Sequence, residues 1–253
     1  MTEIIKIRNV SKTFLSQKVC VEAIGNVLFD VNEHQFVSVL GPSGCGKSTL
    51  LRIIAGLIPP TSGEVIVHGN RVNGPNPEVG IVFQSPVLLP WRNVLDNIEL
   101  QVEVRGLDRA IYRDKAKALL GLVGLEGFET SYPWQLSGGM QQRVSLCRAL
   151  IHDPSLLLMD EPFGALDAFT REQMNLELQR IWLETKKTVL FITHNIAEAV
   201  FLSDQIIILC RRPSKVQEVI KVDLSRPRTL DSMHKPEFLQ AVDRCRDVLI
   251  SCG

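Results

Sequence analysis

The stretch from Gly41 to Thr49 has the residue types and spacing of a phosphate-binding loop. It reads GPSGCGKST and matches the pattern GxxxxGK[ST]. Glycines let the backbone curl so that successive N–H groups face one phosphate, and the positive end of a following helix adds to their attraction. The pattern therefore predicts a nucleoside triphosphate, and its candidate binding residues are Gly41, Pro42, Ser43, Gly44, Cys45, Gly46, Lys47, Ser48 and Thr49.

Two side chains of this loop have chemical roles of their own. Lys47 can neutralise the β- and γ-phosphate oxygens, and Ser48 can offer its hydroxyl oxygen to Mg²⁺. A strand-like run before the loop and an apolar helical run behind it give the context that such a loop requires. A chance glycine-rich turn is the alternative, and the loop alone would also fit kinases and GTPases.

Two adjacent acids, Asp160 and Glu161, follow the apolar run from Ser155 to Met159. The carboxyl ends of parallel strands form the ligand crevice of an α/β sheet, so Asp160 can reach the Mg²⁺ shell. Glu161 can then polarise an attacking water, which favours hydrolysis over transfer to a second substrate. The alternative is a pair of acids that caps a helix.

A second glycine turn, from Ser137 to Gly139, opens a predicted helix that runs to Ile151. A hydroxyl and unobstructed amides at a helix start form another anion site. The chain thus has two such helix starts but one lysine loop. We infer that two chains pack head to tail, with each nucleotide between the loop of one and the turn of the other. An ordinary serine cap before a glycine turn is the alternative.

Short apolar runs predict the strands that position these residues. Helical periodicity between them predicts a layered α/β fold. From about Val94 to Leu150 the pattern contains helix formers and no strand, and a last helix is expected from Pro236 to Ile250. The predicted strands are Ile4–Val10, Val27–Val31, Phe36–Leu40, Glu64–Val67, Val79–Phe83, Leu156–Met159, Thr188–Ile192, Gln205–Leu209 and Val216–Val222.

Composition excludes several classes of protein. The 28 basic and 28 acidic residues among 253 leave no surplus charge for binding nucleic acid. No apolar stretch approaches the roughly 20 residues of a membrane-spanning helix, and no secretory signal precedes the first strand. We therefore expect a soluble chain in the cytosol. Its six cysteines lack metal spacing, so we expect reduced thiols, with a lowered pKa plausible for Cys45 among phosphate-binding amides.

The order of the motifs resembles that of the ATP-binding-cassette ATPases over nearly the whole chain. The similar segments are the phosphate loop, LSGGMQQR from Leu136, LLLMDEP from Leu156, Ala165–Asp167 and Thr193–His194. The resemblance implies an α/β P-loop NTPase with a RecA-like core, an antiparallel β subdomain and a helical subdomain. It implies an ATPase domain over residues 1–226, with the helical subdomain at about 90–150, and a C-terminal helical extension over 227–253.

The same resemblance implies further roles for four residues. Phe14, an aromatic after the first strand, would stack on adenine, and Gln84 would bind Mg²⁺ and sense the attacking water. Asp167 would link the two active sites of the dimer, and His194 would contact the γ-phosphate. The chain departs from the family pattern at His34, Cys147 and Asn195, none of which is a direct phosphate contact.

Within that family, the sequence favours a transporter motor. It has no long coiled coil, which chromosome and repair ATPases insert, and it has one cassette rather than the two of ribosome-associated relatives. A motor without a spanning helix needs a transmembrane permease as its partner. The segment Ser85–Arg92 places Val87, Leu88, Leu89 and Trp91 in a loop that either receives a permease helix or fills a groove of its own chain.

The amino-acid sequences of two segments resemble one particular branch of prokaryotic importers. LLPWRNVLDNIEL and THNIAEAVFLSDQIIIL are similar to the importers of nitrate, sulfonates, taurine and related small anions. That resemblance implies a subunit at the cytoplasmic face of the membrane and a separate periplasmic or lipid-anchored substrate-binding protein. An importer of an osmolyte, amino acid or vitamin precursor is the alternative, followed by an ATPase outside transport.

Overall fold

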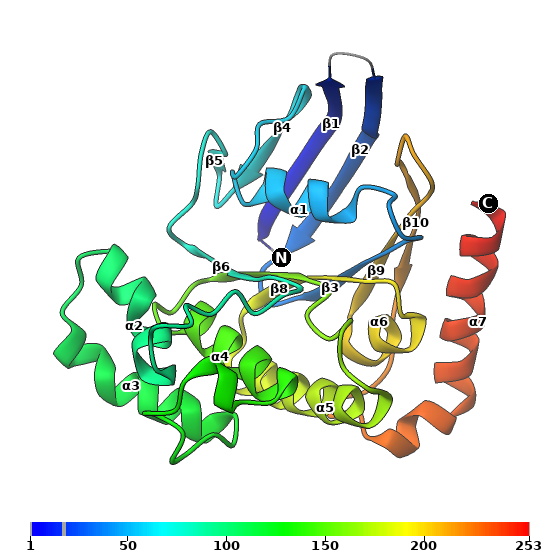
Figure 1. Ribbon diagram of the computed structural model, residues 1–253. Coiled ribbons are helices and arrows are strands. Elements are labelled where there is room, and N and C mark those ends of the chain that lie inside the picture. The colour runs from blue at the N-terminus through cyan, green and yellow to red at the C-terminus, as the bar shows by residue number, and fades with distance from the viewer. Residues whose placement is uncertain (1, 17–18, 253) are drawn as a thin grey trace. The chain divides into compact units, whose positions relative to one another are not determined.

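The computed structural model describes residues 2–16 and 19–252 and divides the chain into two compact units. Unit 1 comprises residues 1–76 and 186–253, and unit 2 comprises residues 77–185 (Figure 1). Both units combine helices with strands, so the predicted α/β class is confirmed.

Unit 1 contains an antiparallel sheet with the strand order β2-β1-β4-β5. Its long hairpin pairs β1 (Glu3–Ser16) with β2 (Val19–Asn32), beside β4 (Ser62–Val67) and β5 (Asn70–Arg71). The sequence predicted much shorter strands here, because register shifts between Ile7 and Thr13 break the alternation of apolar residues on which that prediction rests. Phe14 therefore lies within β1, and the expectation that it follows the first strand is wrong.

The second sheet region of unit 1 has the order β10-β9-β3-β8. The strands β3 (Phe36–Leu40), β8 (Thr188–Thr193) and β9 (Gln205–Leu209) are parallel, and β10 (Val216–Lys221) pairs antiparallel with β9. Every residue of β3 and β8 is buried, which explains why both strands are apolar except for Ser38 and the threonines at the two ends of β8. The helical elements of this unit are α1 (Lys47–Ile54), α6 (Ile196–Leu202), the 3₁₀ turn Leu230–His234 and α7 (Pro236–Ser251).

Unit 2 is mainly helical around one pair of parallel strands, β6 (Val79–Val82) and β7 (Leu156–Asp160). The helices α2 (Val94–Val104), α3 (Arg109–Leu122) and α4 (Gly138–Leu150) pack on one another, and α5 (Ala168–Thr185) follows β7. A 3₁₀ turn, Pro133–Gln135, precedes α4. No strand lies between Val94 and Leu150, as the sequence predicted.

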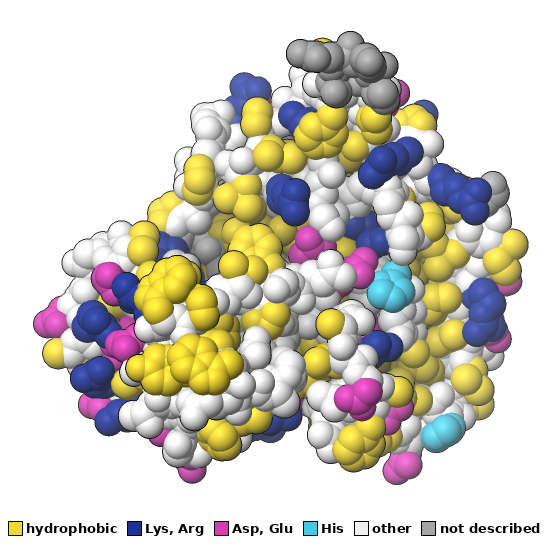
Figure 2. All heavy atoms as spheres, in the orientation of Figure 1, with side chains coloured by type: hydrophobic (Ala, Val, Ile, Leu, Met, Phe, Trp, Pro, Cys, Tyr) yellow, Lys and Arg dark blue, Asp and Glu magenta, His cyan; other side chains and the backbone are white. Residues whose placement is uncertain are grey.

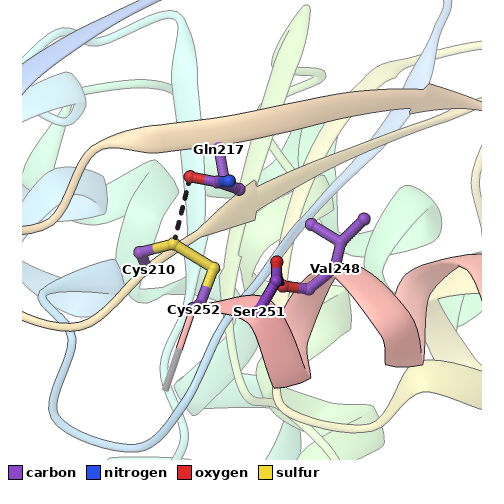
Figure 3. The surroundings of a disulfide bond; sticks show 5 residues. All are labelled: Cys210, Gln217, Val248, Ser251 and Cys252. Atoms are coloured by element: carbon purple, nitrogen blue, oxygen red, sulfur yellow. Dashed lines mark hydrogen bonds between the residues drawn. A yellow bond between two sulfur atoms is a disulfide. The ribbon is translucent and has the colours of Figure 1, made fainter.

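The expectation of reduced thiols is wrong for Cys210 and Cys252, which form a disulfide (Figure 3). They lie 42 residues apart in the sequence, but the end of β9 and the end of α7 bring their Cα atoms to 5.0 Å. Spacing alone could not reveal this pair, because the contact depends on how α7 packs. Cys20, Cys45, Cys147 and Cys245 are free thiols.

Candidate functional site

The phosphate loop follows β3 and is packed tightly within unit 1. A Cβ built on Gly41 would lie 2.7 Å from the Leu209 carbonyl oxygen and 2.9 Å from Cys45 Sγ, so only glycine fits there. Gly46 precedes α1 with φ 111°, a left-handed conformation that favours glycine. Ser43 and Gly44 are exposed, whereas Cys45, Gly46 and Lys47 are buried. The chain itself therefore fixes the curl of this loop.

Lys47 is turned toward the loop, as a phosphate ligand there requires. Its Nζ donates to the carbonyl oxygens of Gly41 at 2.9 Å and Pro42 at 3.1 Å. Burial raises the pKa of the Cys45 thiol, and the nearby Lys47 charge opposes that rise without cancelling it. The expectation of a lowered Cys45 pKa is therefore wrong, because burial outweighs the positive surroundings.

Unit 1 brings His194 next to the phosphate loop. β3 and β8 are parallel neighbours, and Leu40 pairs with Thr193 at their carboxyl ends. The phosphate loop starts after Leu40, and His194 starts the turn after Thr193, so both lie at the same edge. The His194 side chain is exposed there. A contact with the γ-phosphate stays a prediction.

Phe14 stands on the hairpin of the same unit. Its ring is 43 % exposed, and Lys12 Nζ lies 5.2 Å from the ring centroid. The hairpin reaches the phosphate loop through β2, because a Cβ built on Gly46 would lie 2.7 Å from the Ala23 carbonyl oxygen. An exposed aromatic ring on that hairpin is compatible with the predicted stacking on adenine.

Unit 2 brings Gln84 and Glu161 together. β6 and β7 are parallel neighbours that pair Val82 with Met159, so Gln84 and the acids Asp160 and Glu161 follow at the same edge. A Cβ built on Gly164 would lie 3.6 Å from both Gln84 Nε2 and a Glu161 carboxylate oxygen. Asp160 is only 8 % exposed. The arrangement places an amide and two carboxylates where a metal-bound phosphate and a water could meet them.

Glu161 is held in an unusual backbone conformation. Its φ is 43°, in the left-handed region, which costs a residue other than glycine about 1–3 kcal/mol. Such strain is concentrated at functional sites. Asp167 lies downstream on the surface, where its Oδ1 accepts from Thr170 N at 3.0 Å. Hydrogen bonding from the Thr170 side chain, followed by that from its main-chain N–H, lowers the pKa of Asp167.

The turn from Ser137 to Gly139 starts α4 as predicted. Ser137 Oγ accepts from Met140 N at 3.3 Å and caps the helix. Ser137 and Gly138 are exposed, and no atom lies within 4 Å of a Cβ built on Gly138. The turn is therefore a helix cap, and it also exposes amides at the positive end of the helix. The two alternatives from the sequence, an ordinary serine cap and an anion site, are thus compatible.

The loop from Ser85 to Arg92 presents apolar side chains in unit 2. Val87 is 56 % exposed and Trp91 is 71 % exposed, while Leu88 and Leu89 are half-buried. Val87 and Leu89 also line a hollow of about 350 Å³ with residues of β6, α2 and α4. Figure 2 shows apolar side chains gathered over the α2 to α4 region of this unit. Part of the loop therefore fills its own groove and part of it is open.

This loop is held by two buried residues that the sequence analysis did not single out. Asn97, on α2, accepts from Leu89 N at 2.7 Å and donates to the Leu89 carbonyl oxygen at 3.1 Å. Arg148, on α4, donates to the carbonyl oxygens of Val87 at 2.8 Å and Pro86 at 2.7 Å. A single buried amide or guanidinium leaves no periodic pattern, so no sequence signal could have identified their partners.

The residues expected to bind Mg²⁺ carry the kind of oxygen donor that this ion prefers, shared with substrate phosphates and water. In unit 1, Ser48 offers a hydroxyl oxygen, and in unit 2, Gln84 and Asp160 offer an amide and a carboxylate oxygen. That these three residues bind one ion stays a prediction. Within residues 2–16 and 19–252, no group of three or more His, Cys, Asp or Glu side chains could hold a metal ion alone. In the same part of the chain, no helix is long and apolar enough to cross a bilayer.

Comparisons with known proteins agree on one family. Residues 24–164 match the family model described as ABC transporter. The chain is 48 % identical to an uncharacterised ABC transporter ATP-binding protein of Methanocaldococcus jannaschii, over 97 % of this chain and 91 % of that protein.

Two relatives have names that state a transported compound. The aliphatic sulfonates import ATP-binding protein SsuB of Bacillus thuringiensis subsp. konkukian is 46 % identical, over 90 % of each chain. The taurine import ATP-binding protein TauB of Shigella sonnei is 47 % identical, over 81 % of this chain and 80 % of that protein.

A solved structure extends the likeness to the fold. It is a dimeric ATP-binding cassette in a post-hydrolysis state with ADP and Pi, with a TM-score of 0.76 and 35 % identity. The similarity covers 87 % of this chain and all of that one. The predicted ABC ATPase fold is thereby confirmed.

Proposed function

Because the chain belongs to the ABC transporter family and is an ATPase, we propose that it energises the import of a small sulfonate, taurine or a related anion such as nitrate. The family carries the ATPase activity, and the names of the relatives support the class of substrate. The import function further requires a surface that transmits the cycle to a permease.

The loop from Ser85 to Arg92 is the observation that carries this proposal. Val87 is β-branched and yet has φ 48°, a conformation that such residues rarely adopt. Asn97 and Arg148 hold the loop through its main chain, so the exposed side chains of Val87 and Trp91 have a fixed place. A strained loop that presents apolar groups on rigid supports is suited to bind another protein, and we propose a cytoplasmic helix of the permease.

The helix α4 supports a mechanical role for this loop. It begins at the Ser137 turn, it carries Arg148 near its other end, and the side chain of Gln142 between them donates to the Phe83 carbonyl oxygen at 3.1 Å. A force on the turn would therefore reach the loop and the chain just before Gln84 through one rigid helix. In this way closure on a nucleotide could move the permease.

We propose the following roles for the residues that bind and hydrolyse ATP. The phosphate loop holds the triphosphate and Lys47 neutralises its charge. Ser48, Gln84 and Asp160 would hold Mg²⁺, which balances phosphate charge when bound. Glu161 accepts a proton from the attacking water, and His194 orients the γ-phosphate. Phe14 stacks on the adenine, and Asp167 connects the two sites of a dimer.

We propose that two copies act head to tail, with the Ser137 turn of one completing the phosphate loop of the other. Loss of the γ-phosphate would reopen the dimer. Glu161→Gln should lower turnover by about two to three orders of magnitude and trap the closed state, because it removes one preorganised catalytic group. Size-exclusion chromatography with ATP should then show dimers, and a profile of monomers alone would contradict the arrangement.

A transport experiment tests the import function. Leu89→Glu or Trp91→Ala should abolish growth of a complemented deletion strain on taurine or an alkanesulfonate as the sole sulfur source. The ATPase rate of the purified subunit should remain, because the loop does not hold nucleotide. Ile111→Glu, at another exposed apolar side chain of unit 2, is the matched control and should grow normally.

Two outcomes would count against this proposal. Loss of nucleotide binding in the Leu89 or Trp91 variants would show that the loop supports the ATP site instead. Normal growth of the deletion strain on every sulfonate and on nitrate would exclude the substrate class. We further propose that the subunit lies at the cytoplasmic face of the membrane and that a separate binding protein, periplasmic or lipid-anchored, delivers the anion.

A further inference from the structure

Two arginines from the chain after β10 cover the carboxyl end of α6. Arg228 is 1 % exposed, and its Nη1 donates to the carbonyl oxygens of Val200, Phe201 and Ser203 at 2.8–2.9 Å. Arg226 Nη2 donates to the Leu202 carbonyl oxygen at 2.5 Å. Together they satisfy the carbonyl groups of the last turn, which lack partners inside the helix.

The short helix α6 needs this support. It spans seven residues, well below the length at which a helix is stable alone. A positive charge at a helix carboxyl end is also favourable to the helix dipole. Burial lowers the pKa of Arg228 to about 10, so the guanidinium stays protonated at neutral pH.

The opposite end of α6 carries the His194 turn. Asn195 caps the helix, with its Oδ1 accepting from Glu198 N at 3.1 Å. Thr193 Oγ1 donates to the Glu198 carboxylate at 2.6 Å and accepts from Asn195 N at 3.0 Å. His194 thus stands between two residues that are both bonded to the first turn of α6, so a shift of α6 would move it.

One of the two arginines, Arg226, is also tied to the strand that leads into the phosphate loop. Arg226 Nε donates to Asp204 Oδ1 at 3.0 Å, and Asp204 Oδ2 accepts from Phe36 N at 2.8 Å. Phe36 is the first residue of β3, and the phosphate loop follows that strand. The arginines therefore connect the supports of His194 and of the loop.

The rest of the C-terminal extension is fixed as well. α7 packs against α6, β9 and β10, and the Cys210–Cys252 disulfide joins its end to the end of β9 (Figure 3). Leu209, one residue before the disulfide, is the residue whose carbonyl oxygen limits the space beside Gly41. Both ends of the extension thus meet parts of unit 1 that lie behind the ATP site.

We propose that Arg228 is a positioning residue for ATP hydrolysis. Arg228 holds α6 and thereby sets the place of His194 beside the phosphate loop. The inference rests on the proposed role of His194 at the γ-phosphate. It assigns to the segment around Arg228 the task of supporting the His194 half of the ATP site.

Steady-state ATPase kinetics of Arg228→Met and Arg228→Lys test this role. Arg228→Met should lower kcat by about 10- to 100-fold, as misplacement of a reacting group does, and leave the KM for ATP within about twofold. Arg228→Lys should keep part of the activity, because it retains the charge but loses the planar fork. Arg244→Met is the matched control, since it removes the Arg244–Glu218 ion pair between α7 and β10, and should match the unaltered protein. A rise in KM as large as the fall in kcat would overturn the inference.

A double-mutant cycle with His194→Ala separates the inference from the proposed function. In the His194→Ala background, Arg228→Met should change kcat by less than about twofold, because the residue that it positions is gone. The same fold-change in both backgrounds would overturn the role of Arg228 and leave that of His194 intact. An unchanged kcat in His194→Ala alone would overturn both.

A spectroscopic measurement covers the case in which Arg228→Met folds poorly. The chain has five histidines, and the imidazole NMR signal missing from His194→Ala assigns His194. That signal should shift or broaden in Arg228→Lys and stay in place in Arg244→Met. An unchanged His194 signal in a folded Arg228→Lys protein would overturn the inference.

Discussion

The two glycine-rich helix starts of this chain differ in how they are supported. The phosphate loop before α1 has buried residues on both sides of its curl. The Lys47 side chain, at the end of the loop, donates a hydrogen bond to the Gly41 carbonyl oxygen at its start. The turn before α4 is exposed at Ser137 and Gly138 and has only one side-chain cap. The first anion site is built by its own chain, whereas the second is open to whatever approaches it.

This difference would suit the two similar sequence patterns to different stages of the proposed cycle. A site whose amides are fixed in advance can bind nucleotide in a single subunit at little ordering cost. The open turn would contact a phosphate only when a second subunit approaches with its bound nucleotide. The comparison thus predicts that damage to the loop affects the first binding step and that damage to the turn affects closure and hydrolysis.

Substitutions that change charge should give the largest difference between the effects of damaging the two sites. Lys47→Ala should weaken ATP binding to the isolated subunit by about 100-fold or more, since it removes a charge-assisted contact. Ser137→Asp keeps a helix cap but places a negative charge toward the phosphate of the partner, so it should lower hydrolysis by at least about 100-fold. Its first binding step should stay within about twofold of normal. Titration with a fluorescent ATP analogue and phosphate release measure the two steps.

Ser137→Asn is the matched control for this prediction, because it keeps the cap without the charge. Its hydrolysis rate should lie between those of the unaltered protein and Ser137→Asp. If Ser137→Asp weakened the first binding as much as Lys47→Ala does, the turn and the loop of one chain would share a nucleotide, and the head-to-tail arrangement would be wrong.

Adding a methyl group to each glycine site should give an intermediate effect. Gly41→Ala would force the new Cβ against Leu209 O and Cys45 Sγ, at a cost of about 1–3 kcal/mol of folding free energy. Gly138→Ala meets no atom within 4 Å and should be neutral or stabilising by up to about 1 kcal/mol. It should still lower hydrolysis by about tenfold, because its methyl group occupies the face that receives the phosphate of the partner.

Thermal unfolding and ATPase assays distinguish the two glycine variants. The comparison requires that Gly41→Ala loses stability and activity together, and that Gly138→Ala loses activity alone. A Gly138→Ala protein with normal turnover would show that the open turn meets no phosphate. Gly69→Ala is unsuitable as a control because its φ of 75° adds strain, whereas Gly74 has open space and serves that purpose.

The sequence could predict the elements whose residues are buried on both faces. β3 and β9 occur at their predicted bounds, Phe36–Leu40 and Gln205–Leu209, because a strand buried on both faces is apolar at nearly every position. The polar residues of these two strands are Ser38 and the half-buried Gln205. The helix starts at the phosphate loop and at the Ser137 turn also lie where the sequence predicts them, and Asp160 and Glu161 lie at the carboxyl end of β7. Their chemistry depends on neighbours in the sequence, so a local pattern is enough.

Features that depend on distant partners could not be predicted in this way. The β1–β2 hairpin is longer than expected because its register shifts disturb the alternation. The disulfide joins residues 42 positions apart, and Arg228 meets α6 from 25 to 28 residues away. Neither produces periodicity in the sequence. The contacts that support the candidate site were therefore less predictable from the sequence than its motifs.

Thiol labelling should give the smallest effect and test the support of the loop directly. Burial raises the pKa of Cys45, so its reactive thiolate fraction at pH 8 is below that of an ordinary thiol with a pKa of about 8.5. Cys20, which is exposed, provides the control in the same molecule. Cys45 should react at least about tenfold more slowly, because burial limits access as well as ionisation, and its rate should keep rising above pH 9.

Mass spectrometry after timed alkylation resolves the two thiols without any substitution. Bound ATP should slow Cys45 further, because the proposed nucleotide site covers the phosphate loop. Equal rates at the two thiols would mean that the loop opens as readily as a surface segment. In that case the loop would have no more built-in order than the Ser137 turn, and both helix starts would depend on the nucleotide, or on the partner, to become ordered.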